Sequence, residues 1–213
     1  MSKIFNGLKT TQMLQERHPE DFYGTPPHAT RQLLVMLKKH SVSLQNKTIL
    51  EPFAGTGLIS EVLRKQGHRV ISFDYTDRGY RVPETDTTGS SFDIANFFSD
   101  SHPINQLNDF HIISNPPYKN AFEAIKKCLF YTPKGNLCCM ILNIRFLEGL
   151  TRYDFFVHNP PKFVFVFVER CNCAKDANFD TCSEYGGTIC YAWFVWEKGN
   201  KSFPILDWID PKS

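Results

Sequence analysis

The sequence predicts an α/β fold, in which a mostly parallel, twisted sheet of about seven strands carries helices on both faces. Two observations support this fold class. Apolar runs of strand length recur along the chain, and most are apolar throughout, as is typical of strands covered on both faces. Helical patterns separate several of these runs at the spacing of strand–helix–strand units, which form parallel sheets through right-handed crossovers.

Six apolar runs are the expected strands. They occupy residues 48–53, 69–74, 110–115, 136–143, 162–168 and 191–196. Helices are expected over residues 57–67 and 120–131, with a weaker pattern near residues 145–157. The polar stretch 75–89 and the loop-like stretch 171–187 are expected to be surface excursions.

Length and composition favour one domain over residues 1–213, because a single core commonly extends to about 200 to 250 residues. The net charge is only +2, so a nucleic-acid contact would need a local basic patch. The N-terminus lacks the apolar core of a signal peptide, and the apolar run at 163–168 is far too short to span a bilayer. We therefore expect a cytoplasmic protein with no membrane contact.

The seven cysteines are expected to be reduced thiols and not a disulfide framework. Four of them are close together in the sequence, namely Cys171, Cys173, Cys182 and Cys190. Their spacing differs from that of good zinc sites. No metal site is predicted.

A glycine turn, EPFAGTG, follows the first expected strand. Gly55 and Gly57 allow a tight turn whose backbone can lie close to a ligand. A phosphate-binding loop would need a Lys-Ser/Thr pair where Leu58 and Ile59 stand, so phosphate is disfavoured. Asp74 ends the second strand nineteen residues after Gly55, near the distance at which an acidic residue binds ribose hydroxyls. Each feature alone fits an ordinary turn or cap, but their order and spacing together favour a nucleoside site.

The third expected strand ends in the tetrad Asn115–Pro116–Pro117–Tyr118. The two prolines cannot donate to a sheet, and they hold the backbone extended and rigid. The Asn115 amide and the Pro116 carbonyl would then face the ligand edge of the sheet as two acceptors, and Tyr118 offers a ring for stacking on a planar substrate. The arrangement fits an amine gripped between two acceptors, and a stiff turn that begins a helix is the alternative.

In this order, EPFAGTG, Asp74 and the tetrad resemble the motifs of S-adenosylmethionine-dependent amino-methyltransferases, in particular the N6-adenine DNA methyltransferases. That family has an acidic-Pro-x-x-Gly-x-Gly turn and an Asn/Asp/Ser-Pro-Pro-aromatic tetrad. The stretch 21–34 resembles the segment that closes over the methionine end of the cofactor in one subgroup, which assigns that role to residues 1–45. The tail 191–199 is similar to small phage-type methylases. The resemblance implies a Rossmann-like methyltransferase fold with S-adenosylmethionine as cofactor.

The resemblance also implies residue roles. Asn115 and the Pro116 carbonyl would accept hydrogen bonds from the target amine, and Tyr118 would stack on the target base. The implied cofactor-binding residues are Tyr23, Thr25, Glu51, Phe53, Gly55 and Gly57 on the methionine side, Asp74 at the ribose, and Asp93 at the adenine amine. Asp93 also fits a plain helix cap. Two acceptors would free the lone pair of the amine, so the transfer would need neither a metal nor a covalent intermediate.

The implied reaction is methylation of the N6 amine of adenine in DNA. Single-stranded or easily opened DNA is the expected substrate, because flipping the base then costs less. Lys119, Lys175 and Phe179 are the expected substrate contacts, the last two together with Tyr185 in the segment 171–190. The alternatives are the same chemistry on RNA adenine or a protein glutamine amide, and an inactive binding module that keeps the fold. The oligomeric state stays open.

Overall fold

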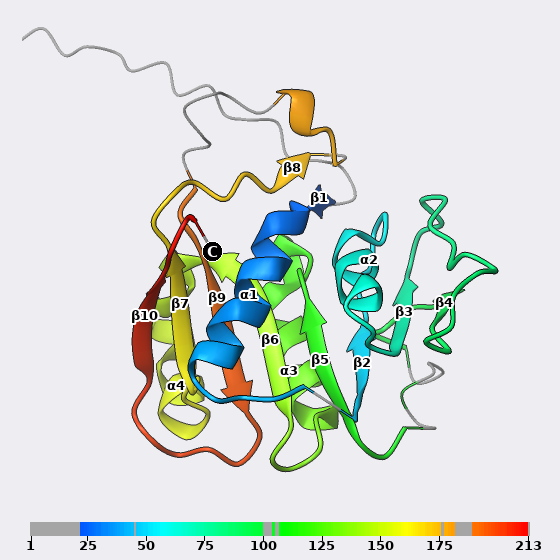
Figure 1. Ribbon diagram of the computed structural model, residues 1–213. Coiled ribbons are helices and arrows are strands. Elements are labelled where there is room, and N and C mark those ends of the chain that lie inside the picture. Colours follow the sequence, from blue (N-terminus) through cyan, green and yellow to red (C-terminus); the bar gives the residue numbers. More distant parts are fainter. Residues whose placement is uncertain are drawn as a thin grey trace, which may run out of the picture.

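The computed structural model describes residues 22–44, 46–99, 104, 107–175, 177–181 and 189–212. Within these residues, one sheet contains β2 (Thr48–Glu51), β3 (Val70–Asp74), β4 (Ser91–Ile94), β5 (Phe110–Ser114), β6 (Leu137–Asn143), β7 (Phe163–Phe167), β9 (Tyr191–Glu197) and β10 (Ile205–Ile209). Their order across the sheet is β10–β7–β9–β6–β5–β2–β3–β4 (Figure 1). The five strands from β4 to β6 are parallel, and β9 is antiparallel to both of its neighbours. The predicted, mostly parallel α/β fold is confirmed.

Helices cover both faces of the sheet. Figure 1 shows α1 (Pro27–Lys39) and α2 (Leu58–Lys65) in front of it, with α3 (Ala121–Tyr131) and α4 (Tyr153–His158) behind. Successive strand residues point to opposite faces, so each strand contributes to two apolar clusters. Ile49, Ile113 and Trp193 pack with α1 and α2, whereas Leu50, Ile112 and Phe194 pack on the opposite face with α3. Among the described residues, no helix has the length and apolar character needed to cross a membrane.

All six expected strands are present, but two further strands of the large sheet, β4 and β10, the short strands of a second sheet described below, and the helix α1 were not predicted. β4 and β10 are the outer strands of the sheet, and their exposed residues form no continuous apolar run. α1 was assigned only as a segment of unspecified structure. The expected helix near 145–157 is wrong over its first half: two 3-10 turns, Ile144–Leu147 and Leu150–Arg152, precede the short α4. Gly149 separates these turns with a φ of 129°, a conformation that a regular helix cannot contain.

Parallel strands place their carboxyl ends at one edge of the sheet, so Glu51, Asp74 and Ser114 end β2, β3 and β5 side by side. A separate two-stranded ladder lies at this edge, between β1 (Tyr23–Gly24) and β8 (Ala174–Lys175). The ladder joins the N-terminal segment to the segment 171–190. Two stretches about 150 residues apart in sequence thus meet beside the strand ends, at the position where open α/β sheets bind ligands.

Candidate functional site

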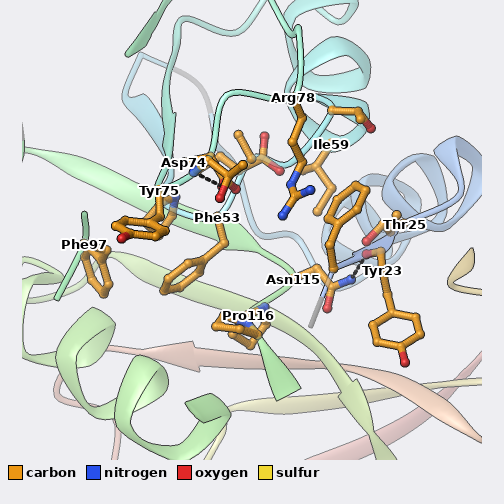
Figure 2. A pocket seen from close by; sticks show the side chains of 18 of the residues that line it. Tyr23, Thr25, Phe53, Ile59, Asp74, Tyr75, Arg78, Phe97, Asn115 and Pro116 are labelled. Atoms are coloured by element: carbon orange, nitrogen blue, oxygen red, sulfur yellow. Dashed lines mark hydrogen bonds between the residues drawn. The ribbon is translucent and has the colours of Figure 1, made fainter. Parts of the chain in front are cut away.

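A cavity of about 410 Å³ opens at the carboxyl ends of β2, β3 and β5 (Figure 2). Cavities of this size commonly bind small-molecule ligands. Its walls are formed by residues within the stretches 22–25, 51–59, 74–78, 96–98 and 115–120. The cavity therefore brings together the following residues singled out from the sequence: Tyr23, Thr25, Glu51, Phe53, Asp74, Asn115, Pro116, Pro117, Tyr118 and Lys119.

The side-chain amide of Asn115 is held in place through its NH2 group. Its Nδ2 donates to the backbone carbonyl of Tyr23 at 2.9 Å (Figure 2). This contact fixes the orientation of the amide, so that Oδ1 is the remaining acceptor. Oδ1 is buried and has no hydrogen-bond partner among the described residues. A buried carbonyl oxygen without a donor is costly, so this atom is poised to accept from a ligand N–H or O–H.

The prolines and Tyr118 continue the wall beyond Asn115. Pro117 has an extended backbone with φ −60° and ψ 127°, and a 3-10 turn begins at Tyr118. The Tyr118 ring stacks on Tyr23, with centroids 5.0 Å apart and planes inclined by 24°. Its hydroxyl donates to the hydroxyl of Tyr191 at 2.8 Å, and burial holds the pKa of Tyr118 well above its usual value. Tyr118 is thus a neutral ring with one face on Tyr23.

Two aromatic side chains pack closely against the glycine turn. Gly55 and Gly57 have φ values of +55° and +78°, in the left-handed region that other residues rarely adopt. A Cβ atom on Gly55 would lie 2.2 Å from the ring of Phe22, and one on Gly57 would lie 2.2 Å from the ring of Tyr80. Both the backbone conformation and the available space therefore require glycine here.

Asp74 is fixed by two backbone N–H groups. Gly55 N donates to Oδ2 at 2.8 Å, and Thr76 N donates to Oδ1 at 3.0 Å. The first contact links the end of β3 to the glycine turn after β2. Each carboxylate oxygen keeps further lone pairs for a ligand in the cavity, since a carboxylate can accept about four hydrogen bonds.

Glu51 is the buried carboxyl of the site, with 1% of its surface exposed. Its Oε2 accepts from the backbone N of Ser60 at 2.9 Å and from the Ser60 hydroxyl. Burial raises the pKa of Glu51 to about 8, although the Ser60 contacts oppose the shift. Glu51 therefore carries a proton at neutral pH, and a cationic group bound nearby would favour its ionised form.

The raised pKa of Glu51 predicts how the stability of the protein depends on pH. In the unfolded chain the pKa of Glu51 is near 4.5, so the folded state binds this proton more tightly. The contribution of this proton to the free energy of unfolding is complete below the unfolded-state pKa, and it is lost as the pH rises through about 8. Glu51→Gln removes the titrating group while keeping an acceptor for Ser60. We expect the melting temperature of the wild type to fall more than that of the variant between about pH 5 and about pH 8, by about 5 °C or more. Parallel curves for the two proteins, measured by circular dichroism, would contradict a protonated Glu51.

Some residues singled out from the sequence do not line the cavity. Asp93 lies exposed within β4, and Asn96, after the end of that strand, lines the cavity instead. Lys175 is described by its backbone alone, which pairs with Tyr23 in the β1–β8 ladder. Phe179 begins a 3-10 turn outside the cavity wall. Tyr185 and Cys182 lie outside the described residues. Within the described ranges, no cluster of three metal-binding side chains occurs.

Sequence reasoning missed several cavity residues, namely Phe22, Tyr75, Arg78, Asn96, Phe97 and Phe98. Tyr75 directly follows Asp74 and is 74% exposed, and Figure 2 shows it beside Phe53 and Phe97. Its place next to an acidic strand end could have identified it. The residues 96–98 depend on β4, which the sequence did not reveal. The cavity thus has an aromatic region near the end of β3 and an unpaired amide oxygen at the end of β5.

The fold matches solved structures at low sequence identity. A protein from Listeria monocytogenes, an inferred class I S-adenosylmethionine-dependent methyltransferase, superposes with a TM-score of 0.54 at 15% identity, over 89% of this chain and 68% of its own. An inferred RNA methyltransferase from Pyrococcus horikoshii gives 0.55 at 14% identity, over 84% of this chain and 88% of its own. The M protein of the type I restriction enzyme EcoKI gives 0.54 at 13% identity, over 85% of this chain and 45% of its own. No protein-family model and no curated protein matches the sequence. The chain has the predicted Rossmann-like methyltransferase fold.

Proposed function

We propose that the protein transfers a methyl group from S-adenosylmethionine to the exocyclic N6 amine of adenine in DNA. One observation carries the proposal: the Oδ1 atom of Asn115 is buried without a partner, and its amide is oriented by the carbonyl of Tyr23. An acceptor of this kind fits an amine better than a hydroxyl, because an amine can donate one N–H to Oδ1 and another to the adjacent Pro116 carbonyl.

The cavity residues fit the cofactor. Asp74 has free lone pairs for the two ribose hydroxyls, and the exposed ring of Tyr75 offers a face to adenine. Asn96 takes the place at the adenine amine that the sequence assigned to Asp93, because only Asn96 lines the cavity. Glu51 and Thr25 lie on the methionine side, where the positive charge of the cofactor would favour loss of the Glu51 proton.

S-Adenosylmethionine supplies an activated methyl group when bound, so the protein needs chiefly to orient the amine and exclude water. Asn115 Oδ1 and the Pro116 carbonyl accept the two N–H groups, which turns the nitrogen lone pair toward the methyl group. The same acceptors stabilise the positive charge that develops on nitrogen. The rigid prolines keep both acceptors in place. S-Adenosylhomocysteine would be the leaving group, and the surplus proton would pass from the nitrogen to water after transfer.

Tyr118 is the proposed stacking surface for the target base. Tyr23 covers one face of its ring, so either Tyr23 moves aside or the base uses the other face. Lys119 lines the same side of the cavity and is placed to meet a backbone phosphate, and Lys175 and Phe179 remain proposed contacts of the segment 171–190. The cytoplasm remains the proposed location.

The test is transfer of a labelled methyl group from S-adenosylmethionine to four polymers, namely single-stranded DNA, duplex DNA, RNA and bulk protein. We expect label on DNA, with single-stranded DNA preferred because no duplex has to open. Label on RNA alone would assign the same site to RNA adenine, and label on protein alone would assign it to a glutamine amide.

A further inference from the structure

Arg78 reaches into the cavity from the loop after β3 (Figure 2). We infer that Arg78, Thr25 and Thr56 form an anion site that takes the α-carboxylate of the amino-acid part of the cofactor. This inference rests on the proposed function, and it gives Arg78 the task of selecting nucleosides that carry an amino acid.

Phe22 supports the guanidinium. The Cζ atom of Arg78 lies 4.3 Å from the centroid of the Phe22 ring, within the range of a cation–π contact. The same ring would collide with a Cβ atom on Gly55, so Phe22 is seated directly on the glycine turn. The positive charge of Arg78 is therefore held beside this turn and is not a mobile surface charge.

Two hydroxyls of the cavity are unsatisfied. Thr25 is 3% exposed, and its Oγ1 is buried without a hydrogen-bond partner among the described residues. The Oγ1 of Thr56, inside the glycine turn, is also buried without a hydrogen-bond partner among the described residues. Both residues line the cavity that Arg78 enters. Buried hydroxyls without partners are rare in folded proteins, so a ligand with acceptor atoms is the expected partner of both.

The start of α2 adds to the attraction. This helix begins at Leu58 after Gly57, which has no side chain to cap it, and the Ser60 N–H in its first turn donates to Glu51. Leu58 and Ile59 line the cavity, so the positive end of the helix dipole faces it. The helix dipole, a guanidinium and two hydroxyl donors together favour a small anion.

The anion has to belong to the nucleoside itself. Gly55 N donates to Asp74 at 2.8 Å, and Thr56 is the next residue, so the expected ribose site and the anion site adjoin. A ligand that reaches both carries its negative charge a few bonds from the ribose, as the amino-acid part of S-adenosylmethionine does.

The test compares two adenine nucleosides by calorimetry. S-Adenosylhomocysteine carries the carboxylate, whereas 5′-methylthioadenosine lacks the whole amino-acid part. We expect Arg78→Gln to weaken binding of S-adenosylhomocysteine about tenfold or more, the effect of one lost charge-assisted hydrogen bond, and to change binding of methylthioadenosine less than about twofold. Arg81→Gln is the matched control, because Arg81 lies on the same loop with 63% of its side chain exposed and pairs with Asp77. We expect it to bind both nucleosides like the wild type.

Each other outcome overturns the inference in a recognisable way. If Arg78→Gln weakened the binding of both nucleosides equally, Arg78 would have a structural role in its contact with Phe22. Unchanged affinity for S-adenosylhomocysteine together with weaker DNA binding would assign Arg78 to a nucleic-acid phosphate. Tight binding of S-adenosylhomocysteine by the wild type and by Arg78→Gln alike overturns the inference alone, whereas a wild type that does not bind S-adenosylhomocysteine overturns the proposed function as well.

Discussion

Asn115→Ala should reduce the rate of methyl transfer by about 100-fold or more while leaving the affinity for S-adenosylhomocysteine within about twofold of the wild type. The variant removes Oδ1, the acceptor placed to stabilise charge on the target nitrogen, and leaves Asp74 and the glycine turn unchanged. Single-turnover kinetics and calorimetry measure the two quantities separately. A loss of this size is typical of one preorganised polar group acting on a transition state.

Asn143→Ala is the matched control for this variant. Asn143 ends β6, the neighbour of β5, and its side chain accepts from the backbone N of Arg145 outside the cavity wall. We expect this control to retain the wild-type rate. Full activity of Asn115→Ala, or equal losses in both variants, would show that the tetrad does not act on the target amine.

Asp74→Ala should weaken binding of S-adenosylhomocysteine by about 100-fold or more, because a carboxylate that accepts from two ribose hydroxyls contributes about 1.5–3 kcal/mol for each charge-assisted hydrogen bond. The change also frees Gly55 N and Thr76 N, which the carboxylate holds in the native protein. Asp74→Asn keeps the size and one acceptor oxygen, so we expect its affinity to lie between those of the wild type and the alanine variant.

Asp77→Ala is the control for the loss of a carboxylate. Asp77 lies three residues further along the same loop, and its carboxylate pairs with the exposed Arg81. We expect binding within about twofold of the wild type. Equal affinities of Asp74→Ala and Asp77→Ala, with both proteins folded by circular dichroism, would remove Asp74 from the cofactor site.

The sequence predicted the fold class well because the central strands are buried on both faces. Their apolar runs reflect that burial directly, and the residues that end β2, β3 and β5 then have to meet at one edge. The outer strands were not predicted because they are exposed. β4 and β10 have one free edge and exposed side chains, so their sequences, SFDI and ILDWI, carry no apolar run.

The site was predictable where residues adjoin strand ends and less so where they come from loops. The glycine turn, Asp74 and the tetrad follow strands directly, and all three contribute to the cavity wall or its support. Phe22 and Arg78 meet only because the N-terminal segment and the loop after β3 fold over the same edge. No local pattern encodes such a contact. Asn96 was missed together with β4, and Asp93, the residue chosen in its place, is exposed.

The central claim is that the target is the N6 amine of adenine, and the most direct measurement is the identity of the methylated product. Single-stranded DNA labelled in the methyl-transfer assay would be digested to nucleosides and analysed by mass spectrometry, with Asn115→Ala as the parallel sample. The proposal predicts N6-methyl-2′-deoxyadenosine from the wild type and at least about 100-fold less from the variant. Label on another atom or another nucleoside, or equal N6-methyladenine from both proteins, would contradict it.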